Sequence, residues 1–589
     1  MAASPPRERV ASSQPIVFAS SADAVGRWLA DLGGSPVVAV DTETSGWDPH
    51  VDRLRLVQVA AGPGHPVLVV DAERCDPRVL RPLLAAPEVL KVFHHGAFDL
   101  RFLRMAGVEV TRVADTMLAE QLLGGGAATA PGSSSLARIA EFRLGMRLDK
   151  SVRAGFAAGG PLTDEQVRYA ADDATATWEV FARQRGELAG HGLNQVARLE
   201  FAAMPVLADL QLRGVGFDAD RWLATLGRLE GELPQLESAV QAALVCEDSP
   251  RDLFGPTPVK LDSPEQVKAA LGRLGVHLEQ THERALRDHR GHPAVDALLA
   301  YRQVSKVTGN WGGDWARRVA HARTGRVHAD WRQIVGTGRI SCREPNLTQV
   351  PRDARYRSCF VAPPGRTLVV ADYSQQELRI LAAVSSDEAL REVFLRGGDL
   401  HRATAAMAFG IPEEAVDPAR RSAAKALNFG LMYGMGARGF ARSTGMTPER
   451  AAEVMRRYFA AFPRVAAWLR EAEATGRRTG RVRTPLGRIR VLDDDEGGTM
   501  ARNAPIQGAG ADMVKLALAE VHRRVGAGGS VDGLVLVVHD ELVVEAAADG
   551  ADEAAARVVE GMAAAAGRVL GDVPSAVDVA VRPHWGCEP

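Results

Sequence analysis

Three apolar runs in this 589-residue chain end at or enclose acidic residues, and this pattern limits the folds that the chain can adopt. The runs are VVAVDTET at 37–44, TLVVADYS at 367–374 and LVLVVHDELVVE at 534–545. Short valine-rich runs predict buried β-strands, and the three polar residues HDE inside the third run predict a β-hairpin. Because the first run lies far from the other two along the chain, we expect two separate sheets, each with carboxylates at an edge.

The segments around these runs predict several domains. Strand and helix patterns alternate from Pro36 to about Ala182, which is typical of an α/β unit. Residues 195–310 and 386–475 have mainly helical patterns, and strands return from 331 onward. The stretch GGGAATAPGSSS at 124–135 has the composition of a loop. A chain of this length is expected to hold about three to five domains.

Composition excludes some classes of protein. No apolar run approaches the roughly 18 residues that a membrane span needs, so we expect no membrane partner. The N-terminus has no apolar core of a secretory signal, and the five cysteines are scattered without a CxxC pair. These features predict a cytoplasmic protein.

Charge alone leaves the class of partner open. The net charge of −2 does not indicate a nucleic-acid binder, but residues 477–490 carry six arginines and no acid. That segment fits either a solvated basic face or a contact with phosphates.

The first apolar run contributes to a group of four carboxylates and a tyrosine. Asp41 and Glu43 are two residues apart on the predicted strand, so their side chains point to one face. Asp99 follows at the predicted start of a helix, and Tyr169 precedes Asp173 by one helical turn. Crowded carboxylates repel each other unless a cation lies between them, and hard oxygen ligands suit Mg²⁺ or Mn²⁺.

A pair of such ions can activate water and stabilise the leaving oxygen of a phosphodiester. Tyr169 is placed to orient that water. Asp172 is an adjacent alternative to Asp173, and the spacing from Tyr169 favours Asp173.

The other two runs predict a second acidic site. Asp372 ends one strand and Asp540 lies at the tip of the hairpin, so both are expected at one edge of a sheet. Between them, four side chains recur every fourth residue and form one stripe on a predicted helix: Arg421, Lys425, Phe429 and Tyr433. Two cations followed by two aromatic rings suit a triphosphate whose base stacks beyond it, although an ordinary amphipathic helix would show the same stripe.

The motifs DYSQQELR at 372–379, RRSAAKALNFGLMYG at 420–434 and HDE at 539–541 resemble motifs A, B and C of family A DNA polymerases. The segments TGRISCREPNLTQVP, GDLHRATA and NAPIQGAGADMVK are similar to further family segments. DTET, HHGAFDL and the Tyr169–Asp173 spacing resemble the tyrosine variant of the DEDD exonuclease superfamily, and LDKSVRAGF is similar to ribonuclease D. Nearly the whole chain thus resembles the large-fragment type of the bacterial polymerase I family.

This resemblance implies a multidomain fold with α/β and α+β parts. A ribonuclease H-like 3′–5′ exonuclease domain is expected at 16–190, after a disordered lead-in at 1–15. A right-hand polymerase domain is expected at 195–589, with its thumb at about 220–310, its palm at about 330–385 and 500–589, and its fingers at about 386–499. No counterpart of a 5′-nuclease module is expected, and nick translation by this chain alone is not predicted.

The resemblance also implies roles for individual residues. Asp41, Glu43, Asp99 and Asp173 would hold two metal ions beside Tyr169. Asp372, Asp540 and the backbone carbonyl of Tyr373 would hold two more, with Glu541 in a supporting role.

Arg421 and Lys425 would bind the triphosphate. Phe429 would stack near the sugar and base and discriminate against dideoxynucleotides, and Tyr433 would line the nascent base pair. Glu377 would exclude a ribose 2′-hydroxyl, His401 would approach the incoming nucleotide, and His539 the primer end. Arg339, Asn503 and Gln507 would contact DNA, with Arg339 and Gln507 in the minor groove.

Four positions depart from the family pattern: Gln376, Val537, Thr348 and Thr499. None is a metal ligand, so they bear on fidelity and translocation rather than on the reaction.

The predicted function is template-directed DNA synthesis with 3′–5′ proofreading in DNA repair or replication. The expected cofactors are two Mg²⁺ ions in each site, with Mn²⁺ as a substitute. The expected partners are primer–template DNA and dNTPs, bound by a monomer at the bacterial nucleoid. Two alternatives stay open: a ribonuclease D-like RNA-processing exonuclease with an inactive polymerase body, and a DNA-binding scaffold with degenerate sites.

Overall fold

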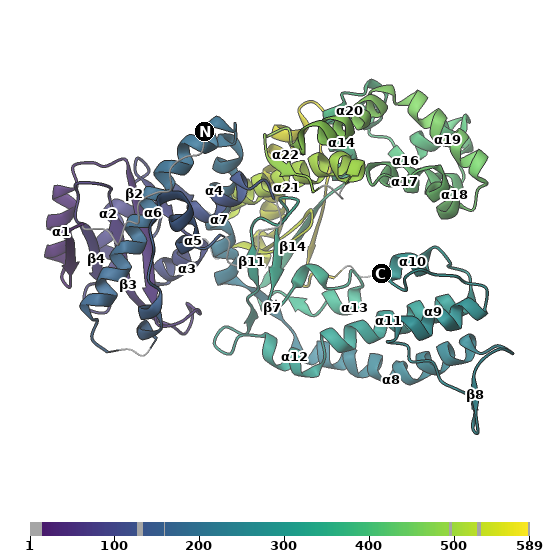
Figure 1. Cartoon of the computed structure of the whole chain (residues 1–589), viewed down its shortest axis with the longest axis horizontal. Helices are drawn as coiled ribbons and strands as arrows, with labels where there is room; N and C mark the ends of the chain where they lie inside the picture. Colours follow the sequence, from purple (N-terminus) through teal and green to yellow (C-terminus); the bar gives the residue numbers. More distant parts are fainter. Residues whose placement is uncertain (1–13, 127–133, 158–159, 494–496, 527–531, 587–589) are drawn as a thin grey trace.

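A computed structural model describes residues 14–126, 134–157, 160–493, 497–526 and 532–586. Most of the expected lead-in at 1–15 and the middle of the expected loop at 124–135 lie outside these residues. None of the helices in the described residues combines the length and the hydropathy that crossing a bilayer requires. The chain forms two units, joined by the long helix α7, Asn194–Arg213 (Figure 1).

The first unit is built on a six-stranded sheet in the order β1-β4-β3-β2-β5-β6, in which β3 runs antiparallel to both of its neighbours. Its strands are β1 Ile16–Ala19, β2 Val37–Thr44, β3 Leu54–Ala60, β4 Val67–Asp71, β5 Leu90–Phe93 and β6 Val113–Asp115. Its helices are α1 Ala22–Asp31, α2 Arg81–Leu84, α3 Ala97–Met105, α4 Thr116–Leu123, α5 Leu136–Leu144 and α6 Asp164–Gly190, with short 3-10 turns at Pro77–Leu80 and Ser151–Phe156.

Helices cover both faces of this sheet, and the alternation of β2 decides which side chains meet which helix. Val38 and Val40 pack in the same core as residues of α1 and α3. Ala39 packs on the other face, in a core that contains Tyr169 and Ala170 of α6. The next side chains on the Ala39 side are those of Asp41 and Glu43, so β2 directs both carboxylates toward α6.

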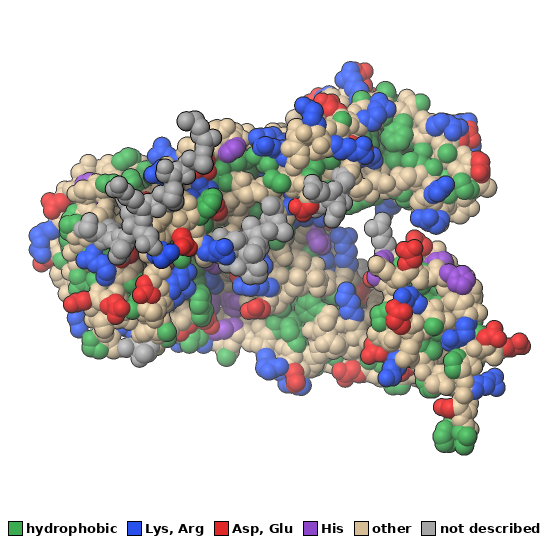
Figure 2. Space-filling model, viewed as in Figure 1, with side chains coloured by type: hydrophobic (Ala, Val, Ile, Leu, Met, Phe, Trp, Pro, Cys, Tyr) green, Lys and Arg blue, Asp and Glu red, His purple; other side chains and the backbone are tan. Residues whose placement is uncertain are grey.

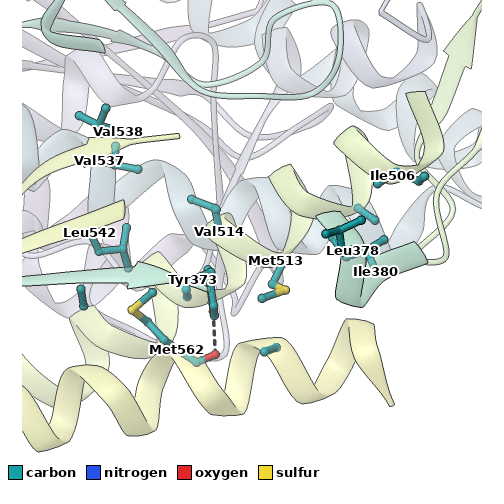
Figure 3. Close-up of a cluster of buried hydrophobic side chains, with 14 of the residues drawn as sticks. Tyr373, Leu378, Ile380, Ile506, Met513, Val514, Val537, Val538, Leu542 and Met562 are labelled. Carbon is teal, nitrogen blue, oxygen red and sulfur yellow. Dashed lines mark hydrogen bonds between the residues drawn. The ribbon is translucent and has the colours of Figure 1, made fainter. Parts of the chain in front are cut away.

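The second unit is built on a four-stranded antiparallel sheet in the order β17-β18-β14-β19. Its strands are β14 Arg366–Tyr373, β17 Gly533–Val538, β18 Glu541–Ala547 and β19 Val577–Arg582. Three helices pack on this sheet or beside it: α14 Gln376–Ser385, α21 Gly497–Val525 and α22 Ala551–Leu570. Figure 3 shows the core beneath β14, where Leu542, Met513 and Met562 are buried together.

Short strands and helices link α7 to the base of this sheet. They are β7 Val215–Phe217, α12 Gly313–Val319, β10 Arg326–Val327, β11 Asp330–Arg332, β12 Ser341–Arg343, α13 Ala354–Arg357 and β13 Phe360–Val361. β11 and β12 form a hairpin that extends toward the first unit (Figure 1).

Two helical projections rise from the second unit. The helical arm, residues 219–310, contains α8 Ala219–Leu244, α9 Pro264–Arg273, α10 Glu283–Arg287 and α11 Pro293–Asn310, and it has a hydrophobic core of its own. The distal lobe, residues 388–491, contains α15 Glu388–Leu395, α16 Leu400–Phe409, α17 Pro418–Met432, α18 Ala437–Thr444, α19 Pro448–Ala461, α20 Pro463–Thr479 and the hairpin of β15 Arg481–Arg483 and β16 Ile489–Val491. Figure 2 shows an open cleft between the arm and the lobe.

A buried ionic cluster ties α7 to the rest of the second unit. The Nζ of Lys515 on α21 lies 2.6 Å from Oε1 of Glu200 on α7 and donates a 2.7 Å hydrogen bond to the carbonyl of Gly338. Arg488, between β15 and β16, pairs with Glu200 and with Asp512 of α21. All four charged side chains are almost fully buried. The cluster therefore fixes the positions of four segments that are distant in the sequence.

Replacing Lys515 with Met is expected to leave Glu200 buried with one partner fewer, and so to destabilise the fold by about 3–5 kcal/mol. Thermal unfolding followed by circular dichroism would measure the loss. A matched control is Arg523→Ala on the same helix, which removes an exposed pair with Glu520 and should cost no more than about 0.5 kcal/mol. Equal melting temperatures for the two variants would contradict a structural role of the cluster.

Candidate active sites

The first site lies where β2 meets α6. Asp41, Glu43 and Asp173 each offer a carboxylate oxygen, and these oxygens lie within 4.8 Å of one another. Two come from one face of a strand and the third from the facing helix, as the spacing of the sequence predicts. Such a set can share one divalent cation or a pair of them.

Asp99 reaches the same site from α3. It lies in the first turn of that helix, where it is buried, and its Oδ1 accepts a 2.6 Å hydrogen bond from the hydroxyl of Thr42. Thr42 lies between Asp41 and Glu43 on β2 and points to the opposite face of the sheet. Asp99 is not one of the three clustered carboxylates, but it lines the same cavity, and its repulsion raises the pKa of Asp41.

The electrostatics of the site favour a bound cation. Burial, and then repulsion by neighbouring carboxylates, raises the pKa of Glu43 to about 8 and that of Asp41 well above its ordinary value. Burial also raises the pKa of Asp99 to about 7 and that of Asp173 to about 6. The raised pKa values mean that ionising these carboxyl groups together costs free energy. A divalent cation would offset that cost, because it favours the ionised form of each group.

Tyr169 lies one helical turn before Asp173 on α6, and its hydroxyl opposes the rise in the pKa of Asp173 that burial causes. Burial raises the pKa of the Tyr169 phenol above its ordinary value, so the group stays protonated and can donate or accept a hydrogen bond. Asp172, the adjacent residue, is absent from the carboxylate cluster, and burial raises its pKa to about 6.

These carboxylates line a cavity of about 740 Å³ that also contains residues absent from the prediction. Trp47 and Phe98 form an edge-on aromatic pair with ring centres 5.6 Å apart, and the guanidinium of Arg153 lies 4.9 Å from the centre of the Trp47 ring. Arg153 also lowers the pKa values of Asp41, Glu43 and Asp173 by attraction. Arg153 lies in the segment LDKSVRAGF, whose similarity to ribonuclease D did not by itself assign a role to this arginine.

The far wall of this cavity belongs to the second unit. It consists of residues 330–336 together with Arg343, from β11, β12 and the chain that follows β11. Nothing in the sequence patterns of the first unit indicated these contacts, because they depend on how the two units pack.

The second site lies at the edge of the four-stranded sheet. Asp372 pairs in register with Glu541 on β18 and with Asp578 on β19, and Asp540 lies in the turn between β17 and β18. The backbone N–H of Tyr373 donates a 3.3 Å hydrogen bond to the carbonyl of Asp540, which holds the turn against β14. Burial, then repulsion by Asp540 and Glu541, raises the pKa of Asp372 to about 7.

Each site contains a buried carboxylate oxygen without a hydrogen-bond partner among the described residues: Oδ1 of Asp173 and Oδ1 of Asp372. A buried acceptor with no partner carries a desolvation cost that a metal ion would remove. The residues present therefore fit a divalent cation in both places.

The carboxylate of Glu541 is already engaged by other side chains, so it is less available to bind a metal ion. Its Oε1 accepts a 2.6 Å hydrogen bond from the indole of Trp585, and both of its oxygens lie within 3.4 Å of a guanidinium nitrogen of Arg357. The Arg357 guanidinium in turn stacks 4.0 Å from the centre of the Trp585 ring. These contacts fit the expected role of Glu541 as a residue that positions the site, because they fix the start of β18 beside Asp540.

The side chain of Tyr373 does not enter the second site. Its hydroxyl donates a 2.7 Å hydrogen bond to the carbonyl of Met562 on α22, in the core shown in Figure 3. Only its backbone is left at the sheet edge beside Asp372, which is what a role for its carbonyl oxygen requires.

Four of the expected nucleotide and DNA contacts come together beside this edge. Arg339 pairs with Glu377 of α14 at 2.7 Å, and the Tyr433 hydroxyl lies 3.2 Å from Glu377. Gln507 of α21 donates a 3.3 Å hydrogen bond to the same hydroxyl. The network joins segments that are far apart in the sequence and leaves Glu377 with its carboxylate directed at Tyr433.

The basic and aromatic stripe lies on α17, with Tyr433 one residue beyond its end. Arg421 and Lys425 are exposed and Phe429 is half-buried, while the opposite side of the helix is buried in the lobe. Arg421 forms a 2.6 Å ion pair with Asp399. His401 on α16 is buried, with its ring 6.0 Å from that of Phe429 and its Nδ1 3.2 Å from Nδ2 of Asn428.

The two remaining expected DNA contacts are Asn503 and His539. Asn503 is a buried residue of α21, and its Oδ1 has no hydrogen-bond partner among the described residues. His539 begins the turn that carries Asp540 and has a left-handed backbone with φ of 60°. Of the four departures, Gln376 is buried and its amide donates a long hydrogen bond, 3.4 Å, to the carbonyl of Gly510 on α21.

Comparison with known proteins decides the family. Residues 16–188 match the model of a 3′–5′ exonuclease family, and residues 232–587, more than half of the chain, match the model of DNA polymerase family A. The chain belongs to DNA polymerase family A. Its expected fold, an exonuclease domain followed by a family A polymerase domain, is thereby confirmed.

Relatives and solved structures agree with this family assignment. DNA polymerase I of Chloroflexus aurantiacus is 31% identical over 99% of this chain, which spans 64% of that relative's length. DNA polymerase I of Aquifex aeolicus is 30% identical, with 96% of this chain and 99% of the relative covered. A solved structure described as the POL domain of Pol1 from M. smegmatis in complex with DNA primer-template and dNTP has a TM-score of 0.80 and 26% identity, with 98% of this chain and 99% of that chain covered.

The geometry of the first site predicts which of two adjacent aspartates binds metal. Asp173→Ala should weaken Mn²⁺ binding at this site by at least about 10-fold, because it removes a clustered ligand. Asp172→Ala, one residue away and outside the cluster, should change binding less than about threefold. Isothermal titration in a background that lacks Asp372 and Asp540 would measure the first site alone. Equal effects of the two substitutions would contradict the assignment of Asp173.

Proposed function

We propose that this chain catalyses template-directed DNA synthesis from dNTPs and removes mispaired 3′ ends by 3′–5′ excision. The observation that carries the synthesis proposal is the meeting of Asp372 and Asp540 at one sheet edge, beside a cleft whose distal lobe carries Arg421 and Lys425. The observation that supports excision is the separate cavity that holds Asp41, Glu43, Asp99 and Asp173.

The parts of the second unit suggest a right hand. We assign the four-stranded sheet with α14, α21 and α22 to the palm, the distal lobe to the fingers and the helical arm to the thumb. The expected limits at about 220–310, 330–385, 386–499 and 500–589 fall close to the ends of these structural parts. We assign residues 16–190 to the exonuclease domain.

In synthesis, the primer 3′-hydroxyl attacks the α-phosphate of the incoming nucleotide in line, and pyrophosphate leaves. Asp372, Asp540 and the carbonyl of Tyr373 would hold two Mg²⁺ ions, for which Mn²⁺ can substitute. Bound there, the ions would lower the pKa of the attacking hydroxyl and balance the charge of the leaving group. This chain's own contribution is to keep Oδ1 of Asp372 out of solvent and to hold the Asp540 turn against β14.

The residues of the lobe would position the nucleotide. Arg421 and Lys425 are exposed cations one helical turn apart, a spacing that suits successive phosphates. Phe429, next along the stripe, would stack near the sugar and base, and His401 lies beside it. To bind a triphosphate, Arg421 must exchange its ion pair with Asp399 for a phosphate oxygen.

In excision, Asp41, Glu43, Asp99 and Asp173 would hold two metal ions, and Tyr169 would orient the attacking water. The cavity is lined by Trp47, Phe98 and Arg153, which suit a single strand with an unstacked base rather than a duplex. Unpairing a matched 3′ end costs more free energy than unpairing a mispaired one, so a mispaired end reaches the site more often.

We further propose that the partners are primer–template DNA and dNTPs and that the chain acts as a monomer. A DNA substrate would place its work at the bacterial nucleoid, in repair or replication. The ribonuclease D-like alternative and the scaffold alternative are disfavoured, because the carboxylates of both sites are present and brought together by the fold.

Replacing Asp372 with Ala is expected to lower primer extension by about 10³-fold or more, because it removes a metal ligand, while excision at the other site continues. A labelled primer–template assay in Mg²⁺, with and without dNTPs and with matched and mismatched 3′ ends, would measure both reactions. Asp173→Ala is the reciprocal control, which should lose excision and keep extension. Extension that persists in Asp372→Ala would overturn the palm assignment.

Glu377 is predicted to control sugar selectivity. Glu377→Ala removes the carboxylate that faces Tyr433 and opens space for a 2′-hydroxyl, so the preference for dNTPs over rNTPs should fall by at least about 10-fold. Single-nucleotide incorporation with dCTP and rCTP would give the ratio. Glu388→Ala, an exposed acid on α15, is the control and should leave the ratio unchanged. A selectivity ratio that does not change in Glu377→Ala would reject this role.

A further inference from the structure

A short hairpin on the helical arm holds two large apolar side chains in solvent. β8, Arg251–Asp252, pairs with β9, Gly255–Pro256, and Leu253 and Phe254 form the connection. Leu253 is 98% exposed and Phe254 97% exposed, more than any other large apolar side chain in the described residues. Figures 1 and 2 show the hairpin projecting from the end of the arm, away from the cleft, with an apolar tip.

Local hydrogen bonds stabilise this conformation. Oδ1 of Asp252 accepts a 2.8 Å hydrogen bond from the backbone N–H of Phe254, and Thr257 donates a 2.8 Å backbone hydrogen bond to Pro250. Gly255 has a φ of 125°, a backbone conformation that favours glycine. The connection is therefore a defined turn, and its geometry directs both apolar side chains outward.

The base of the hairpin is fixed to the arm. The side chain of Gln241 on α8 donates a 2.8 Å hydrogen bond to the carbonyl of Val259 and accepts a 2.9 Å hydrogen bond from its N–H. Val259 itself packs against the core of the arm. A tip of two apolar side chains on an anchored, hydrogen-bonded hairpin is suited to enter a pocket, since little order has to be gained on binding.

The charge of the surrounding surface indicates which kind of partner fits. Residues 229–259, which run along α8 and through the hairpin, contain one basic residue, Arg251, and six acids: Glu230, Glu232, Glu237, Glu247, Asp248 and Asp252. Such a surface repels DNA phosphates and anionic lipid headgroups. It also disfavours binding to a second copy of this chain through the cavity of the first site, because that cavity is lined by acidic residues.

We propose that Leu253 and Phe254 insert into an apolar pocket with a basic rim on another protein. The apolar pair would supply the buried centre of the contact, and the acidic stretch of α8 would steer the approach and pair with the rim. Because the hairpin points away from the cleft, this partner can stay bound while the cleft holds primer–template DNA.

The test places a photo-crosslinking residue, p-benzoylphenylalanine, at position 254 of the full chain, expressed in the cells that carry its gene. A matched chain carries the same residue at position 388, an exposed acidic site on α15 of the distal lobe, outside the proposed contact. The protein crosslinked at 254 but not at 388 is then purified, and its affinity for the uncrosslinked full chain is measured by isothermal titration. We expect L253S/F254S to weaken this affinity by about 30-fold or more, E247K/D248K to weaken it too, and added salt to act in the same direction.

Primer extension on naked DNA by L253S/F254S should equal that of the unmodified chain, which shows that the variant folds. The proposal fails if position 254 crosslinks to DNA, to a second copy of this chain, or to nothing beyond what position 388 captures. It also fails if the purified partner binds L253S/F254S as tightly as the unmodified chain, or if its binding surface is acidic.

Discussion

The ionic cluster centred on Glu200 is the interaction on which the relative positions of both sites depend. Burial alone would raise the pKa of Glu200, but the attraction of Lys515 and Arg488 lowers it below its ordinary value, so the group is ionised inside the core. An ionised carboxylate without water is stable only while its partners stay in place. Its partners come from α21 and from the β15–β16 hairpin at the base of the distal lobe, and Gln333 after β11 donates to it as well. If any of these segments shifted, a buried charge in the cluster would lose a partner.

The two acidic sites use the same physical arrangement on different sheets. In each, a largely buried strand carries a carboxylate in its next-to-last position, Glu43 on β2 and Asp372 on β14. Other elements bring further carboxylates to it: α6 and α3 in the first site, and the β17–β18 turn in the second. Burial makes each group costly to ionise without a cation, as the raised pKa values of Glu43 and Asp372 indicate. The surrounding sheets hold these carboxylates close together even without an ion, so the metal sites are preorganised by the fold.

Local pattern predicted the parts of these sites that depend on periodicity. The period of two on β2 placed Asp41 and Glu43 together, and the helical turn from Tyr169 selected Asp173 over Asp172. The valine-rich runs gave β14 and the β17–β18 hairpin with nearly correct limits. What local pattern could not supply were contacts set by packing between distant segments, such as the capture of Glu541 by Trp585 and Arg357. The β8–β9 hairpin also escaped prediction, because a four-residue ladder is too short to produce a periodic signal within a helical region.

The cavity of the first site is completed where the two units meet. The sequence of the first unit therefore predicted the carboxylates but not the far wall of the cavity. This cavity is closed by β11 and β12 of the second unit, and Asp330 of that wall is held by ion pairing with Arg343. Beside the wall, Asp48 of the first unit lies 2.7 Å from Nε2 of His321 of the second, and the rings of His50 and His328 lie 4.7 Å apart. The carboxylates come from one unit, but the shape of the cavity depends on this joint. Since Gln333 contacts both the cavity and Glu200, the same buried cluster that orders the second unit also sets the far wall of the first site.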